Sequence, residues 1–166
     1  RALTAGEVVA IFGDFDADGV TGTALLAQCL REMGASVIPY LPDRVDEGHG
    51  LNDQAIRTFR DSGVSLIVTV DCGITSSEEV EEAASLGMDT IITDHHPPLH
   101  RLPAALAIVN PNLTGSAYPF PSLAGVGLAF KLVQGLSQRM GRRWDKRLLQ
   151  LVDLGTVTVV TPPWWA

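Results

Sequence analysis

The sequence predicts an α/β fold in which a mostly parallel β-sheet is flanked by helices. Short β-branched runs alternate with segments of helical periodicity along the first half of the chain, which is typical of βαβ units. The first run, residues 8–12, is apolar throughout, as expected for a strand buried on both faces. With 46% hydrophobic residues among 166, one domain can form a packed core without disulfides.

Each element can be placed in order from apolar runs and from helix start and stop signals. The expected strands are residues 8–12, 36–41, 66–70, 90–93 and 107–109. The first helix spans 21–33 and ends before Gly34, and the second is capped by Asn52 and ended by Gly63. A third begins with a capping box at Thr75 or Ser76. Helices are also expected at 123–136 and, with basic character, from Trp144.

The net charge and the cysteine content bear on which ligands the protein binds and on the compartment in which it works. The formal charge of −7 is unfavourable for binding a polyanion, unless divalent cations neutralise the acids locally. Cys29 and Cys72 form no C-x-x-C pair, which is typical of reduced, cytoplasmic thiols. No apolar run approaches the roughly 20 residues of a membrane span, so we expect a cytoplasmic protein without a membrane partner.

Acids and histidines directly follow three of the predicted strands. They are Asp14, Asp16 and Asp18 in D-F-D-A-D-G, Asp71 in D-C-G, and Asp94, His95 and His96 in T-D-H-H-P. The carboxyl ends of parallel strands lie at one edge of a sheet, where ligands bind. The sequence therefore predicts one rim that carries five carboxylates and two imidazoles.

Such a rim favours a metal-dependent phosphoesterase. Crowded carboxylates raise one another's pKa unless cations hold them, and carboxylates with imidazoles suit manganese or magnesium, with zinc not excluded by affinity. Two ions about 3.5–4 Å apart could hold a hydroxide nucleophile and stabilise the leaving oxygen of a phosphoryl displacement. Any one motif alone is also compatible with a turn that satisfies its own backbone.

The three motifs resemble, in order and spacing, the signature of DHH-family phosphoesterases. Residues 13–24, 47–51, 123–132 and 154–157 further resemble the RecJ-like branch of that family. The resemblance extends over nearly the whole chain. It implies a DHH domain that hydrolyses single-stranded DNA as a 5′→3′ exonuclease in repair and recombination, with two Mn²⁺ or Mg²⁺ ions.

The resemblance also implies roles for individual residues. Those expected to hold the metals or to act at the metal centre are Asp16, Asp18, Asp71, His95 and His96. Asp14 and Asp94 match motif acids that orient ligands, with Asp14 also counted as a metal-site residue and Asp94 as a catalytic one. Arg44 is expected to bind a phosphate. His49 is expected either to contact substrate or to support its loop.

Two departures from the family pattern concern the C-terminal part of the chain. Relatives continue G-T-V with Ala-Asp-Val, and that Asp is a further metal ligand, whereas Val159 stands here. We expect residues 1–157 to form the catalytic domain and residues 158–166 an atypical tail. The family's C-terminal DHH-associated domain is not part of the sequence, so the activity of this fragment is left open.

Two weaker signals have alternative interpretations. The amides of Gly125-Val126-Gly127 could bind a phosphate, or the glycines could permit close helix packing. The basic residues of the C-terminal stretch could contact DNA or form a solvated helical face. These residues are Lys131, Arg139, Arg142, Arg143, Lys146 and Arg147.

Three other functions are compatible with parts of the sequence. A DHH phosphodiesterase acting on short oligonucleotides, cyclic dinucleotides or pyrophosphate would have the same rim. A haloacid-dehalogenase-like phosphatase would use Asp14 and Asp16 in aspartyl-phosphate chemistry, which leaves Asp71 without a role. A non-catalytic RecJ-like module would have lost its acids, although only the acid expected at Val159 is missing.

Overall fold

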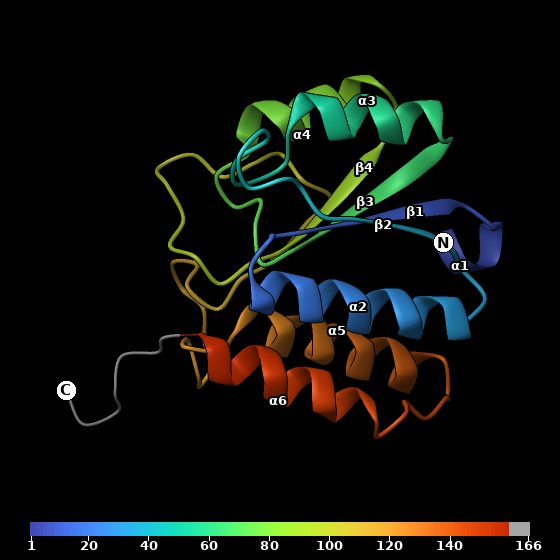
Figure 1. Ribbon diagram of the computed structural model, residues 1–166, viewed down its shortest axis with the longest axis vertical. Coiled ribbons are helices and arrows are strands. Elements are labelled where there is room, and N and C mark those ends of the chain that lie inside the picture. Colours follow the sequence, from blue (N-terminus) through green and yellow to red (C-terminus); the bar gives the residue numbers. More distant parts are fainter. Residues whose placement is uncertain (160–166) are drawn as a thin grey trace.

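The computed structural model, which describes residues 1–159, contains a five-stranded sheet in the order β2-β1-β3-β4-β5 (Figure 1). All four strand pairs are parallel, so the predicted fold class is confirmed. The strands are β1 (Val8–Gly13), β2 (Ser36–Tyr40), β3 (Val64–Val70), β4 (Asp89–Thr93) and β5 (Ala107–Val109).

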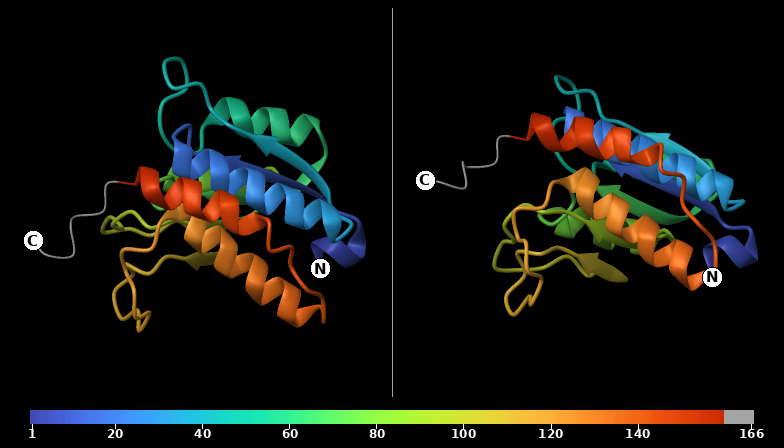
Figure 2. Two further views of the ribbon diagram at one scale, coloured as in Figure 1. Left: turned by 60° about the horizontal axis from the view of Figure 1, so that its bottom comes forward. Right: turned by 90° about the horizontal axis from the view of Figure 1, so that it is seen from below.

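Helices cover both faces of this sheet. They are α1 (Ala2–Ala5), α2 (Ala17–Glu32), α3 (Asp53–Asp61), α4 (Ser77–Ser85), α5 (Gly125–Arg139) and α6 (Leu148–Thr158). Figure 1 shows α3 and α4 on one face and α2 and α5 on the other, with α6 against α2 and α5 (Figure 2). Among the residues described, no helix has both the length and the apolar character that a membrane crossing requires.

Strand β1 is the centre of two hydrophobic cores. Val9 and Ile11 belong to the core under α2 and α5, whereas Ala10 and Phe12 belong to the core under α3 and α4. Successive side chains of a strand point to opposite faces, so an apolar residue is required at every position. This confirms the prediction that residues 8–12 form a strand buried on both sides.

The start of α2 differs from the prediction by a full turn. The sequence predicts a helix from residue 21, but the helix begins at Ala17. Asp16 caps it by accepting a hydrogen bond from the backbone N–H of Gly19 at 3.0 Å, which satisfies one of the free donors of the first turn. The second half of the acidic motif is therefore the first turn of a helix.

Three further differences concern helix ends. The capping box predicted at the start of α4 is wrong, because Ser76 is the N-cap residue but makes no side-chain cap hydrogen bond. The basic helix predicted from Trp144 begins only at Leu148, and the indole of Trp144, which precedes it, packs edge-on against Phe130 at 4.8 Å between ring centroids. Helix α1 was not predicted. The Asn52 cap is confirmed, with its Oδ1 accepting from the N–H of Ala55 at 2.8 Å.

Candidate metal centre

Strand register brings the three motifs to one edge of the sheet. Gly13 pairs with Val70 and Val70 with Thr93, so the next residue on each strand is an aspartate at the same level. The backbone ladder continues through these aspartates. Asp14 N–H donates to the Val70 carbonyl at 3.2 Å, and Asp71 N–H donates to the Thr93 carbonyl at 2.9 Å. The predicted rim is thus a direct consequence of pairing among β1, β3 and β4.

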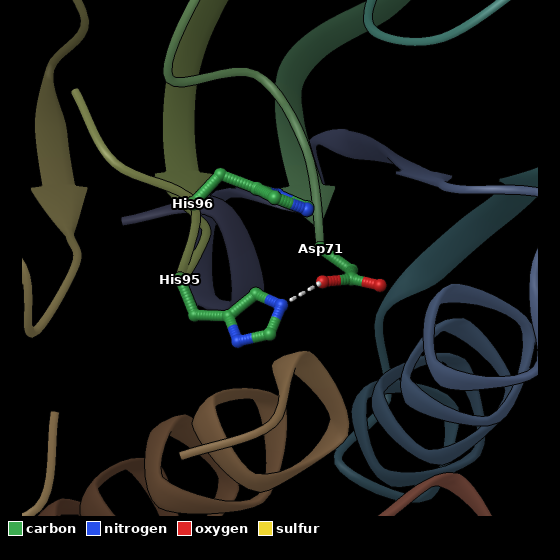
Figure 3. A group of neighbouring side chains, drawn as sticks. All are labelled: Asp71, His95 and His96. Atoms are coloured by element: carbon green, nitrogen blue, oxygen red, sulfur yellow. Dashed lines mark ion pairs between the residues drawn. The ribbon is translucent and has the colours of Figure 1, made fainter. Parts of the chain in front are cut away.

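Two groups of side chains at this rim have ligand atoms within 4.8 Å of one another. One group is Asp71, His95 and His96 (Figure 3). The other is Asp14, Asp16 and Asp71. Asp71 belongs to both groups, so its carboxylate lies where two adjacent cations would share a ligand.

The backbone of Asp71 is unusual in a way that suits this position. Its φ of 63° makes it the only residue other than glycine with positive φ among residues 1–159. Aspartate tolerates this region better than most residues, but it is seldom occupied. Strained backbone of this kind is concentrated at functional sites. Figure 3 shows one oxygen of the Asp71 side chain facing the ring of His95.

The carboxylate of Asp71 is buried and incompletely satisfied. Burial raises its pKa to about 6, although the contact with His95 opposes the shift. Its Oδ1 lies 3.1 Å from His95 Nε2, but their geometry does not make a hydrogen bond, and within the described chain Oδ1 has no hydrogen-bond partner. A carboxylate oxygen and a ring nitrogen thus face a common space without being aligned with each other, although the nearby carboxylate raises the pKa of His95. A shared cation would satisfy both.

Asp94 orients the second histidine. Its buried carboxylate accepts hydrogen bonds from the backbone N–H of Ile74 at 2.9 Å and that of His96 at 3.0 Å. It also lies 2.7 Å from His96 Nδ1. This hydrogen bond is the largest cause that raises the pKa of His96, to about 9. With Nδ1 engaged, Nε2 is the ring nitrogen left for a ligand, which is the usual carboxylate–histidine arrangement around metals.

Asp14 and Asp16 have different surroundings despite their proximity. Asp14 is buried, with Oδ1 accepting from the Phe15 N–H at 2.8 Å and Oδ2 lying 3.3 Å from His49 Nδ1. Asp16 is exposed and caps α2. The first turn of α2 packs against Asp14 and requires a glycine at position 19, because a Cβ at Gly19 would lie 2.5 Å from the Asp14 carbonyl oxygen.

Asp18 lies outside both ligand groups. Its buried carboxylate accepts hydrogen bonds from the backbone N–H groups of Gly125 at 2.7 Å and Val126 at 2.6 Å. Burial raises its pKa while these hydrogen bonds lower it. A carboxylate at a helix N-terminus is favoured by the helix dipole, so Asp18 joins the start of α2 to the start of α5.

This contact decides between the two interpretations of the Gly125-Val126-Gly127 segment. The first two amides donate to Asp18 and are not directed to a phosphate. A Cβ at Gly125 would lie 2.5 Å from Asp71 Oδ1, and one at Gly127 would lie 2.7 Å from Leu123. Close packing of α5 against the acidic rim therefore explains the glycines.

Two asparagines that support the histidine loop were missed by the sequence analysis. The side-chain amide of Asn110 donates to the His96 carbonyl at 2.9 Å, and that of Asn112 donates to the His95 carbonyl. Asn110 also accepts from the Asn112 N–H at 2.7 Å. The only available signal was the N-P-N turn directly after the short fifth strand.

Removing the buried member of this pair is expected to weaken metal binding. In Asn110→Ala the His96 carbonyl loses its donor, so the loop that carries both histidines is less firmly held. Outer-shell changes of this kind reduce metal affinity by roughly 10–100-fold. Calorimetric titration of Mn²⁺ measures the effect.

The matched control for this prediction is Gln138→Ala. It removes an exposed side-chain amide in the last turn of α5, which belongs to neither ligand group, and it should keep the wild-type affinity for Mn²⁺. Equal Mn²⁺ affinities of Asn110→Ala and Gln138→Ala would contradict the supporting role of Asn110.

Arg44 and His49 both lie beside the acidic motif. The guanidinium carbon of Arg44 is 5.3 Å from the centroid of the Phe15 ring, and the His49 ring is 4.3 Å from the same ring. His49 also lines a cavity of about 350 Å³ together with Asp14, Asp71 and His96. The structure thus places both predicted substrate-binding residues at the edge of the acidic rim, next to Phe15.

The predictions for the C-terminal part of the chain have mixed outcomes. Val159 follows α6 in extended conformation and packs, partly buried, against the core under α2 and α5. Residues 160–166 of the predicted tail lie outside the described residues. The six basic residues are exposed, and five of them lie at or beyond the C-terminal end of α5, away from the acids that contact its N-terminus (Figure 1). This arrangement favours the interpretation that the basic residues form a solvated surface, and not the interpretation that they belong to the acidic rim.

Comparison with known proteins agrees with this geometry. The family model described as "DHH family, N-terminal domain" matches residues 8–156. The chain belongs to the DHH family. A relative of this DHH domain in Bacillus subtilis (strain 168), the single-stranded-DNA-specific exonuclease RecJ, is 46% identical over 98% of the chain. The RecJ of Escherichia coli (strain K12) is also 46% identical over 98% of the chain.

A solved structure gives the same relationship in three dimensions. The crystal structure of an exonuclease RecJ bound to manganese has a TM-score of 0.88 with this DHH domain, at 37% identity over 98% of the chain. The chain covers 41% of that structure and spans 20% and 30% of the Bacillus and Escherichia relatives. It therefore corresponds to one part of these longer proteins.

Proposed function

We propose that this chain is the catalytic lobe of a metal-dependent exonuclease that hydrolyses phosphodiester bonds of single-stranded DNA. The observation that carries the proposal is the position of Asp71 in both ligand groups. The names of the curated relatives support single-stranded DNA as the substrate, and a neighbouring structure with bound manganese supports Mn²⁺ or Mg²⁺ as the cofactor. Residues 1–157 form this lobe in our proposal, with a further C-terminal domain in the full-length protein.

The residues present fit two divalent cations. Asp14, Asp16 and Asp71 offer carboxylate oxygens for one, and Asp71, His95 and His96 offer an oxygen and two imidazole nitrogens for the other. The buried Asp71 Oδ1, which has no hydrogen-bond partner within residues 1–159, is the atom that most needs a cation. When bound, such ions supply positive charge at the phosphate and lower the pKa of water.

The other residues position these groups and the substrate. Asp94 fixes the His96 ring through Nδ1. Asp18 ties α2 to α5, so that the acids of the first motif and Asp71 stay at a fixed separation. The exposed Arg44 is a cation beside the acidic motif that can bind a phosphate group in a bidentate manner. Without cations the carboxylates would repel a nucleic acid backbone.

The test is a nuclease assay with Mn²⁺ and single-stranded DNA labelled at its 5′ end. Early release of labelled mononucleotide that disappears in His95→Ala is the expected result and would support the 5′→3′ exonuclease. Release from the 3′ end would contradict the polarity. Faster hydrolysis of a dinucleotide than of the longer strand would favour the phosphodiesterase alternative.

A further inference from the structure

The aromatic ring of Phe15, at the edge of the acidic rim, has no role in the proposed function. Phe15 lies between Asp14 and Asp16 and is half-buried. The His49 ring meets it at 4.3 Å between centroids with a tilt of 45°, and the Arg44 guanidinium carbon is 5.3 Å from its centroid. Two side chains of one loop therefore converge on a single ring.

Within residues 1–159, the guanidinium of Arg44 is held by this ring and by no carboxylate. The ion pairs that arginines make in this part of the chain involve Arg1, Arg101 and Arg147. A cation over an aromatic face is attracted to the ring without using its N–H donors. Arg44 therefore keeps these donors for a phosphate while its position is restricted.

The loop itself is anchored at its base and exposed at its tip. Glu47 accepts hydrogen bonds from Tyr40 Oη at 2.6 Å and from Asn52 Nδ2 at 3.0 Å. Arg44 and His49 are both exposed, and 74% of the His49 side-chain surface is accessible. Beyond the anchor at Glu47, the Phe15 ring is the contact that Arg44 and His49 share.

We propose that Phe15 is a positioning residue that holds Arg44 and His49 beside the metal centre, so that Arg44 is presented to the terminal 5′-phosphate of the substrate. The inference rests on the proposed function and deepens it, because it assigns recognition of the strand end to a residue inside the acidic motif. Phe15 acts through Arg44 and takes no part in the hydrolytic step.

The experiment compares binding of two short oligothymidylates, one with a 5′-phosphate and one with a 5′-hydroxyl, by fluorescence anisotropy with Ca²⁺ in place of Mn²⁺. In Phe15→Leu we expect about a tenfold loss of affinity for the phosphorylated strand, equivalent to about 1.4 kcal/mol, and an unchanged affinity for the hydroxyl strand. Phe15→Tyr, which keeps the ring, should bind as the wild type. Equal losses for both strands, or none for either, would overturn the proposal.

A double variant separates positioning from general damage. If Phe15 acts through Arg44, then Phe15→Leu causes no further loss in an Arg44→Gln background, whereas independent effects would add. Phe15→Met, which fills a similar volume with a flexible apolar chain, repeats the test if Phe15→Leu does not fold. Failure of the wild type to distinguish the two strands would also overturn the proposal.

These results can be told apart from a failure of the proposed function. Binding is measured without turnover, so a chain that binds the 5′-phosphate through Phe15 and Arg44 but hydrolyses nothing would contradict the nuclease activity alone. A chain that hydrolyses DNA but ignores the Phe15 substitution would contradict the positioning role alone.

Discussion

Asp71→Asn is expected to abolish Mn²⁺-dependent hydrolysis while leaving the metal-free domain at least as stable as the wild type. Asp71 contributes to both candidate ligand groups, so one substitution removes a charged ligand from each. A loss of several kcal/mol of charge stabilisation corresponds to a decrease in rate of at least about 10³-fold.

The stability half of this prediction follows from the surroundings of Asp71. Burial raises its pKa to about 6, so above that pH the folded metal-free protein carries the charged form at a cost in stability relative to the unfolded chain. Asparagine is isosteric, uncharged and tolerant of positive φ, so the substitution relieves this cost. Unfolding in urea at pH 8 measures the stability, and nuclease assays measure the rate.

The matched control is Asp61→Asn, which makes the same change at an exposed position at the end of α3. It should change neither the rate nor the stability. Retention of more than a few per cent of the Mn²⁺-dependent rate in Asp71→Asn would contradict the shared-ligand geometry, and a strongly destabilised variant would contradict the stability argument.

The sequence was sufficient for those parts of the fold and site that depend on local patterns. Continuous apolar runs predicted β1 and β3, and the position of Asp71 and Asp94 directly after strands predicted that they would meet at one edge. The register of Gly13, Val70 and Thr93 then makes this meeting nearly unavoidable.

What the sequence could not predict depends on partners far apart in the chain. Asp18 bonds to amides 107 and 108 residues away, so its part in anchoring α5 has no local signature. Asp-Gly near a helix start has low helix propensity, which is why the first turn of α2 was predicted as loop. The support of the His95 carbonyl by Asn112 likewise spans 17 residues and appears only once β5 is placed beside β4.

The affinity for Mn²⁺ is expected to rise steeply with pH, because the ion must displace a proton from His96. The pKa of this histidine is raised to about 9, chiefly by its hydrogen bond to Asp94. The ring is therefore protonated at neutral pH in the metal-free protein, whereas a metal ligand must be neutral. Each pH unit below about 9 lowers the apparent affinity about tenfold, and below about pH 6 protonation of Asp71 steepens the fall.

Removing the carboxylate should flatten this profile. In Asp94→Asn the pKa of His96 moves back toward its ordinary value, so the affinity between about pH 7 and 8.5 depends less steeply on pH, with the raised pKa of His95 beside Asp71 as the remaining source of the slope. The affinity is also lower, because the His96 ring is less firmly oriented. His100→Ala, which removes an exposed histidine outside the ligand groups, should keep the wild-type slope. Calorimetric titration of Mn²⁺ across this range measures all three, and a flat wild-type profile would contradict the prediction.

The proton on His96 also makes the stability of the fold depend on pH, and the direction of this dependence differs between the Mn²⁺-bound and metal-free chains. A raised histidine pKa stabilises the metal-free fold at low pH, and this contribution is lost as the pH rises through about 9. Bound Mn²⁺ stabilises the folded state more as its affinity increases. This affinity rises with pH, whereas the contribution of the histidine to the stability of the metal-free fold falls. The difference in Tm between the Mn²⁺-bound and metal-free chains should therefore widen from about pH 6.5 to 8.5, and it should widen much less in Asp94→Asn.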